Sequence, residues 1–391
     1  MAPIPFRLRD RHVLPLAMFF GTFSWSFVYI SLPFHIHRIS TWDEVTTLAW
    51  TGWILGVPNL VTVATAPFMG GLAERGNPKF LYVLAQVLQG VAFLGMAAAR
   101  TLPELLVVRL ALGLIGASST FAFVSAGRSA DPAEVRRQVV AVQSAMTVGQ
   151  VIGPLAGAIA AARLGFRESF VVGAAILLAC GALAHWGLVD LGGGAGRRQA
   201  TAVPTRWADV LVVSLIVLAG SAQVFFLTAI LPQILPPLGV PVERTLEIGG
   251  LLIFASGVAA ALGSMLASRL AEIVGDRRLI PGLLAVSSLF VVALAMARSL
   301  WPFGVLRFFQ VLCIAPVFPV VVARIAQSAG GAAIGVINSA RIGAAFLGPV
   351  IATSLLAWTS ATAVYVALGM LGLACVPLAR MRLGGAREGR A

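Results

Sequence analysis

Residues 70–79 read Gly-Gly-Leu-Ala-Glu-Arg-Gly-Asn-Pro-Lys, a short polar segment that separates two long apolar stretches. Part of this segment returns 198 residues later, where Leu270-Ala271-Glu272 again follows an apolar stretch and precedes Gly275, Arg277 and Arg278. A local pattern that recurs at such a distance indicates an internal repeat.

The same repeat appears elsewhere along the chain, at offsets that stay between 195 and 199 residues. The matched pairs are Gly21-Thr22 with Gly220-Ser221, Leu32-Pro33 with Leu231-Pro232, Arg109 with Arg307, Gln143-Ser144-Ala145 with Asn338-Ser339-Ala340, and Gly153-Pro154 with Gly348-Pro349. Matches in chain order at a nearly constant offset predict two homologous halves.

The composition places these halves in a membrane. Of the 391 residues, 59% are hydrophobic and 11% are charged, whereas soluble domains carry about 25% charged residues. Runs long enough to span a bilayer, which takes about 20 residues, occur at 13–34, 47–70, 80–99, 102–126, 139–162, 169–189, 210–235, 247–268, 279–297, 301–324, 331–357 and 361–380. The sequence predicts an all-α integral membrane protein whose twelve transmembrane helices form two pseudo-symmetric six-helix bundles.

The break between the sixth and seventh runs, residues 190–209, is polar and Gly-rich, as flexible linkers are. We expect an N-terminal bundle at 1–189, a cytoplasmic linker at 190–209 and a C-terminal bundle at 210–391. With a cytoplasmic N-terminus, 19 Arg and Lys residues fall inside, six fall outside and three lie within spans. This asymmetry predicts that both termini are cytoplasmic, and the first apolar run lacks a cleavage site, so we expect it to be retained.

Other protein classes fit poorly. The net charge of +13 comes from scattered arginines rather than from a basic stripe, which argues against a nucleic-acid partner. Cys180, Cys313 and Cys375 lie in apolar runs without metal-ligand spacing, which predicts packing roles and no metal or cofactor. Neither a phosphate-loop GK[ST] nor a G-x-S-x-G motif is present, so an enzyme is not expected.

Three motifs together resemble the major facilitator superfamily over the whole chain. They are the 70–79 loop, Arg109-x3-Gly113-x2-Gly116-Ala117 in the fourth run, and Gly149-x3-Gly153-Pro154-x2-Gly157 in the fifth. The last is similar to that of the proton-coupled drug antiporters of the superfamily. In the loop, the usual Gly stands one place early and Pro78 replaces the first basic residue. The resemblance implies a monomer in the plasma or bacterial inner membrane that moves a small-molecule substrate by alternating access.

The loop motif has a physical interpretation as a conformational latch. Charged side chains at the cytoplasmic helix ends can bridge to neighbouring helices in one state and separate in the other. The candidates are Gly71, Glu74, Arg75, Glu272 and Arg277. The alternative is that these residues are loop charges that serve only the topology.

The glycines of the fifth run repeat every four residues and therefore share one helix face. Small residues on one face let a neighbouring helix approach closely, and a proline permits a bend. Gly149, Gly153, Pro154 and Gly157, with Gly348 and Pro349 in the second half, are thus candidates for a hinge between moving helices or for static packing.

The resemblance places the substrate cavity mainly on the first and fourth spans of each half. The polar and aromatic candidates are Ser24, Trp25, Tyr29, Arg109, Gln143, Gln223, Arg307, Gln310, Asn338 and Arg341. A charged side chain at mid-membrane is costly and is usually functional, and Arg341 is the deepest. Arg109 and Arg307 lie nearer the outer ends, where bonds to backbone carbonyls are as reasonable as ligand contact.

All 15 Asp and Glu residues fall in tails, loops or span ends, although proton-driven exporters usually hold a buried acid. The candidates for proton coupling are therefore His35, His37 and Glu247 at the outer end. The alternative for the two histidines is an interfacial structural role.

The sequence thus predicts a secondary active exporter of amphipathic small molecules or drugs, with protons as the candidate coupling ion. An organic-anion carrier or exchanger with an arginine-lined cavity is the alternative, because three arginines without a buried acid leave a positive cavity. A scaffold that kept the fold without transport is a third class.

Overall fold

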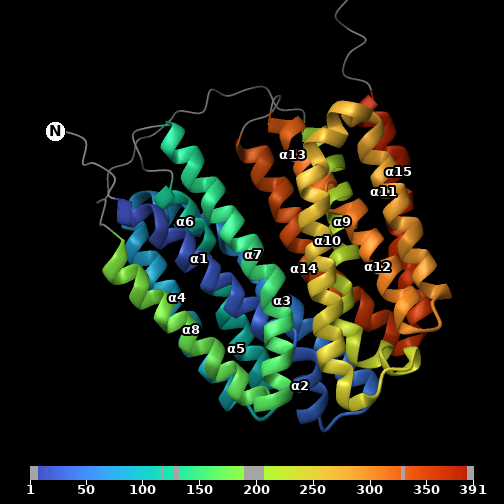
Figure 1. Cartoon of the computed structure of the whole chain (residues 1–391), viewed down its shortest axis with the longest axis horizontal. Helices are drawn as coiled ribbons and strands as arrows, with labels where there is room; N and C mark the ends of the chain where they lie inside the picture. Colours follow the sequence, from blue (N-terminus) through green and yellow to red (C-terminus); the bar gives the residue numbers. More distant parts are fainter. Residues whose placement is uncertain (1–7, 117, 127–131, 189–206, 327–330, 385–391) are drawn as a thin grey trace, which may run out of the picture. The chain divides into compact units, whose positions relative to one another are not determined.

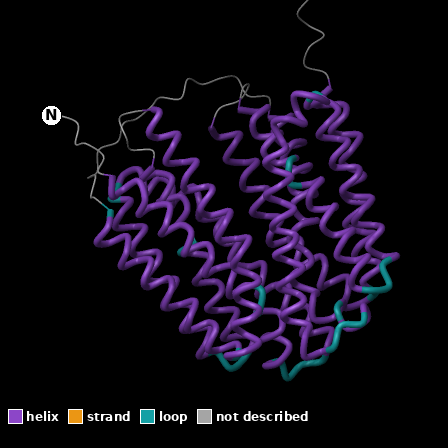
Figure 2. The backbone as a smooth tube through the Cα atoms, viewed as in Figure 1, coloured by secondary structure: helices purple, strands orange, loops and turns teal. Residues whose placement is uncertain are grey.

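The computed structural model describes residues 8–116, 118–126, 132–188, 207–326 and 331–384. Every regular element in these ranges is a helix (Figure 2). The α-helices are α1 (Leu8–Tyr29), α2 (Leu32–Ile39), α3 (Glu44–Arg75), α4 (Pro78–Ala98), α5 (Leu102–Leu114), α6 (Ser118–Ala126), α7 (Pro132–Leu164), α8 (Phe166–Gly187), α9 (Trp207–Ile234), α10 (Thr245–Val274), α11 (Asp276–Ala293), α12 (Leu300–Ile314), α13 (Val317–Ala326), α14 (Gly331–Trp358) and α15 (Ala361–Gly384). Short 3-10 turns lie at Pro236–Leu238, Val242–Arg244 and Leu294–Met296.

Twelve helical segments within the described residues are long and apolar enough to cross a bilayer. Each lies over one of the twelve apolar runs of the sequence, from His12–Ile39 to Ala361–Met381. The prediction of an all-helical protein with twelve membrane spans is confirmed, and the chain is a multi-pass membrane protein.

Three of the spans consist of two consecutive helices, which the continuous apolar runs did not predict. The first span breaks between α1 and α2, the fourth between α5 and α6, and the tenth between α12 and α13. Gly116 lies at the break in the fourth span and Pro316 at the break in the tenth. Glycine weakens a helix interior and proline removes a backbone donor, so both favour an interruption.

The helices of the chain form two units. The first unit comprises Met1–Ser40 and Val57–Arg198, and the second comprises Thr41–Gly56 and Gln199–Ala391. In the first unit, α1 packs along α7 and α4 packs along α8; in the second, α9 packs along α14 and α11 along α15 (Figure 1). The first span packs on the fifth and the third on the sixth in both halves, so the two halves repeat their helix pairing.

Each unit has its own apolar core. Leu14, Met18, Tyr82, Phe121 and Val142 are among the buried residues of the first. The core of the second includes Val213, Ile216, Leu284, Val321 and Ile337. These side chains lie between helices and hold them together by excluding solvent and lipid.

The first part of α3 belongs to the second unit. Within that unit the Trp53 ring packs edge-on against Phe346 of α14, with the ring centroids 5.4 Å apart. A Cβ atom added at Gly56 would lie 2.8 Å from a Phe346 ring carbon, so the glycine permits the close approach. The predicted domain boundary at 190–209 stays a prediction, because residues 189–206 lie outside the described residues.

Candidate substrate-binding site

In the first unit a buried arginine is held between two aromatic rings. Arg109 of α5 is 2% exposed, and its guanidinium carbon lies 5.8 Å from the Trp25 ring centroid and 5.9 Å from that of Tyr29. Trp25 and Tyr29 are four residues apart on α1 and so share a face. The arrangement is a cation–π contact that joins the fourth span to the first.

Gln89 of α4 connects Trp25 to the break in the fourth span. Its Oε1 atom accepts a hydrogen bond of 2.7 Å from Trp25 Nε1, and its Nε2 atom donates one of 2.7 Å to the Ile115 carbonyl. That carbonyl lies where α5 ends. Ser24, in contrast, donates to the Gly173 carbonyl of α8 at 2.7 Å and serves the packing of α1 on α8.

The arginine of the second unit donates hydrogen bonds to several oxygen acceptors. Arg307 of α12 is 1% exposed. Its Nη1 atom donates to the Gln223 carbonyl at 2.7 Å and to Gln310 Oε1 at 2.5 Å, and its Nη2 atom donates to the Val224 carbonyl at 2.8 Å. The Phe226 ring lies 5.4 Å from the guanidinium carbon. Most donors of Arg307 are thus used within the protein.

The side chains around Arg307 form a buried polar network. Gln223 Nε2 donates to Ser288 Oγ at 2.8 Å and to the Leu368 carbonyl at 3.2 Å. Ser287 Oγ donates to Gln223 Oε1 at 3.1 Å and accepts from Gln310 Nε2 at 3.0 Å. Four spans of the second unit, the seventh, ninth, tenth and twelfth, are joined by these bonds.

The two arrangements are related by the internal repeat. Gln89 and Arg109 correspond to Ser287 and Arg307, each pair being separated by 198 residues; at the 199-residue offset of the first and seventh spans, Trp25 corresponds to Val224, the neighbour of Gln223. The sequence predicted the pair of Arg109 and Arg307, and it named Trp25 and Gln223 only as separate cavity candidates. Gln89 and Ser287 were missed because they lie in the third and ninth spans, although the 198-residue offset could have identified them.

Arg341 has different surroundings. Its side chain is exposed on α14, and its guanidinium carbon lies 4.8 Å from the Phe318 ring centroid of α13 in the same unit. Asn338, half-buried, lies three residues earlier on that helix, and Gln143 of α7 in the first unit is exposed. Of the three arginines within spans, Arg341 is thus the one that is exposed as a residue.

Among the proton-coupling candidates, His35 is the most enclosed. It is 2% exposed, neither ring nitrogen has a hydrogen-bond partner, and the Phe166 and Phe170 ring centroids lie 5.6 and 5.1 Å away. His37 in the first unit and Glu247 in the second are half-buried. Asp43 of the second unit is exposed, and hydrogen bonds from the side chain and backbone of Thr46 lower the pKa of its carboxyl, so it stays ionised at neutral pH.

The latch candidates are only partly visible. Glu74 and Arg75 are in the last turn of α3, but their side chains lie outside the described residues. Gly71 has open space around its Cα, and Glu272 and Arg277 are exposed in the second unit. The latch stays a prediction.

The glycines of α7 all face α1. A Cβ atom added at Gly149 would lie 2.6 Å from the Phe19 carbonyl oxygen, and one at Gly153 would lie 2.7 Å from Ser26 Cβ; at Gly157 it would overlap the Phe27 carbonyl. Pro154 lies inside α7. In the second unit, Gly348 faces α9, and Pro349 lies inside α14. The motif thus forms a tight helix contact inside each unit; its role as a hinge stays a prediction.

Comparison with known proteins agrees with this geometry. The Major Facilitator Superfamily profile matches residues 14–246. The chain is 24% identical over 325 residues to the multidrug resistance protein MdtG of Serratia proteamaculans, covering 79% of this chain and 77% of that protein. It is also 24% identical over 314 residues to MdtG of Citrobacter koseri, covering 77% and 75%.

Solved structures share the fold. The nucleoside transporter NupG, as a D323A mutant, has a TM-score of 0.76 at 11% identity and covers 95% of this chain and 99% of its own. The human organic anion transporter MFSD10 has a TM-score of 0.70 at 15% identity and covers 96% and 100%. Since the profile spans more than half of the sequence and the fold has twelve spans, this chain belongs to the Major Facilitator Superfamily of membrane transporters.

Proposed function

We propose that the protein is a secondary active transporter that exports amphipathic small molecules, including drugs, by alternating access. Its relatives named as multidrug resistance proteins, at 24% identity over about three quarters of both chains, support this substrate class. The substrate crosses without covalent change, so no catalytic residue and no cofactor are required.

The observation that carries the proposal is the contact of Arg109 with the Trp25 and Tyr29 rings. Aromatic faces offer flat apolar area to the hydrophobic part of an amphiphile, and polar groups beside them can orient its polar end. In the state described, the guanidinium occupies these faces. A lipophilic cation would compete with it for the rings.

The membrane setting follows from the charge distribution. We infer a location in the plasma or bacterial inner membrane with both termini cytoplasmic, because 19 basic residues would then lie inside and six outside. A monomer is sufficient for this function, since each of the two units has its own core.

Protons are the proposed coupling ion, and His35 is the proposed carrier. A buried imidazole without a hydrogen-bond partner has unmet polar groups, and such groups are costly unless another conformation satisfies them. Alternating access would supply that conformation by exposing His35 to water. The positive side chains near it are Arg38 and Arg167.

Two conformational roles complete the proposal. Gly71, Glu74, Arg75, Glu272 and Arg277 would hold one state of the transporter as a latch. Gly149, Gly153, Pro154 and Gly157, with Gly348 and Pro349, would keep each unit rigid while permitting a bend at the prolines. A Glu74→Ala variant that inserts normally but transports poorly would support the latch, whereas normal transport would remove it.

A second candidate, an organic-anion carrier, is favoured by one observation, the exposed Arg341 within a span, whose guanidinium carbon lies 4.8 Å from the Phe318 ring centroid. An anion could bind this group by charge-assisted hydrogen bonds. The organic-anion carrier is the alternative outcome of the experiment that tests the export proposal.

The test measures the thermal stability of the detergent-purified protein with lipophilic cations, neutral drugs and organic anions, for the parent, Arg341→Ala and the exposed control Arg298→Ala. A ligand at a hundredfold excess over its Kd stabilises the folded state by about 2.7 kcal/mol. We expect cations or neutral drugs to stabilise all three proteins. If organic anions stabilise the parent and Arg298→Ala but not Arg341→Ala, the export proposal is wrong and the protein is an organic-anion carrier.

A further inference from the structure

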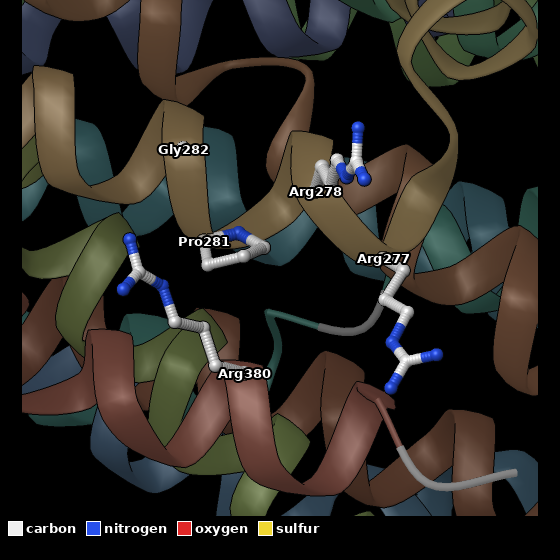
Figure 3. Close-up of a pocket in the computed structure, with 5 residues that line it drawn as sticks. All are labelled: Arg277, Arg278, Pro281, Gly282 and Arg380. Atoms are coloured by element: carbon white, nitrogen blue, oxygen red, sulfur yellow. The ribbon is translucent and has the colours of Figure 1, made fainter.

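A positively charged cavity of about 500 Å³ lies in the second unit, away from the arginines within the spans. Its lining residues are Arg277, Arg278, Pro281 and Gly282 of α11 and Arg380 of α15. In Figure 3 the Arg380 side chain extends from α15 beside Pro281, while Arg277 and Arg278 project from the start of α11 in different directions. Three of these five lining residues carry a guanidinium group, and none of the five carries a carboxylate.

The cavity lies at the ends of two candidate membrane spans. The membrane span of α11 begins at Arg277, and that of α15 ends at Met381. Arginine side chains at the ends of spans lie at the boundary between hydrocarbon and water. We therefore expect the three guanidinium groups to lie at the level of lipid phosphates.

The helix dipole does not explain the two arginines of α11. They lie in its first turn, where the positive end of the dipole disfavours cations. The N-cap residue is Gly275, with a φ of 78°, so no side chain there accepts from the free N–H groups. An anion in the cavity would offset both the repulsion among the arginines and the unfavourable dipole.

An apolar stripe continues from the cavity along α11. Arg278, Gly282, Val286 and Leu289 follow at helical spacing on one face. Val286 is 43% exposed and Leu289 is 56% exposed, and no heavy atom lies within 4 Å of a Cβ built at Gly282. Along α11 the charged Arg278 is followed by the open space at Gly282 and then by an exposed apolar face. This order matches a lipid, in which a phosphate headgroup is followed by an acyl chain.

We propose that this cavity binds the phosphate headgroup of an anionic phospholipid, with an acyl chain along the Gly282–Leu289 face. Guanidinium groups suit phosphate because they donate two parallel hydrogen bonds, and basic pockets between helices at the cytoplasmic side are known to suit such headgroups. The proposal is independent of the transported substrate.

Native mass spectrometry of the detergent-purified full chain tests this site by giving the Kd of the first bound phosphatidylglycerol. The variants are the double substitution Arg278→Gln with Arg380→Gln, and the control Arg298→Gln, an exposed arginine just beyond the opposite end of α11. Each basic residue near a lipid surface contributes about 1 kcal/mol, so the double variant should bind about thirtyfold more weakly. The control should bind like the parent.

Two further arms separate the possible ligands. Phosphatidylcholine of the same chain length should bind more weakly than phosphatidylglycerol, and equal binding would overturn the preference for an anionic lipid. Inorganic phosphate at equal concentration should not displace phosphatidylglycerol; displacement would assign the cavity to a water-borne anion. Unchanged lipid binding by a double variant that elutes as a single folded species would overturn the proposal.

Discussion

Arg307 on the tenth span donates a 2.7 Å hydrogen bond to the backbone carbonyl of Gln223 on the seventh. The guanidinium carbon of its repeat counterpart Arg109, on the fourth span, lies 5.8 Å from the ring centroid of Trp25 on the first. In each half an arginine of the fourth span of that half contacts the first span of the same half: the contacts of Arg307 include backbone hydrogen bonds, and those of Arg109 include two aromatic rings. The hydrogen bonds of Arg307 determine what its loss should change.

Replacing Arg307 should chiefly reduce stability. Arg307→Met removes the donors to two carbonyls and to Gln310, and buried acceptors without donors are costly. We expect a loss of about 2 to 4 kcal/mol, seen as a lower midpoint of thermal unfolding in detergent. Arg341→Met, at an exposed arginine, is the control and should unfold like the parent. Equal unfolding of the two variants would refute the structural role of Arg307.

Gln89 should support both stability and transport. Gln89→Leu leaves Trp25 Nε1 without its acceptor and the Ile115 carbonyl without its donor, which should cost about 2 kcal/mol. The Trp25 ring would also lose its fixed orientation, so transport should fall several-fold in variants that still fold. Gln150→Leu, an exposed glutamine on α7, is the comparison. A fully active Gln89→Leu protein would show that the ring needs no such support.

The glycine face of α7 should not tolerate a methyl group where it meets a backbone. At Gly157 the added methyl would overlap the Phe27 carbonyl, and a backbone atom cannot move as a side chain does. Gly157→Ala should lower the free energy of unfolding by about 1 to 3 kcal/mol and reduce the yield of folded protein. Gly343→Ala, on α14 with open space around the Cα, should keep the parent yield. Similar yields of the two variants would contradict tight packing of α7 on α1.

Much of the fold was predictable because hydrophobic length and the 198-residue offset are properties of the sequence itself. The breaks at Gly116 and Pro316 were not, since both residues lie inside apolar runs that continue on either side. The repeat also shows which substitutions change chemistry, as at Gln89 and Ser287, where the first half has an amide and the second half has a hydroxyl.

The candidate site was predictable only in part. The first and fourth spans supplied Trp25, Tyr29 and Arg109, but the partner Gln89 lies on a span expected outside the cavity. The structure shows that the arginines differ in burial, since Arg307 is enclosed by acceptors and Arg341 is exposed. No pattern in a single sequence predicts such a difference, because it depends on which carbonyls of a neighbouring helix face the guanidinium.

His35 should couple transport to protons. His35→Gln removes the titratable ring but keeps polar atoms, so downhill movement of substrate should continue while pH-gradient-driven accumulation is lost. His185→Gln, at an exposed histidine on α8, should keep both activities. Both are measured in the same proteoliposomes with and without an imposed pH gradient. Normal gradient-driven accumulation by His35→Gln would exclude this histidine as the carrier.

The central claim is export of amphipathic small molecules, and transport by the purified full chain in proteoliposomes tests it most directly. The measurement follows a fluorescent lipophilic cation and an organic anion under an imposed pH gradient, against protein-free vesicles. The account predicts that the cation accumulates against its concentration gradient and that the anion does not. Accumulation or exchange of the anion alone, with no movement of the cation, would contradict it.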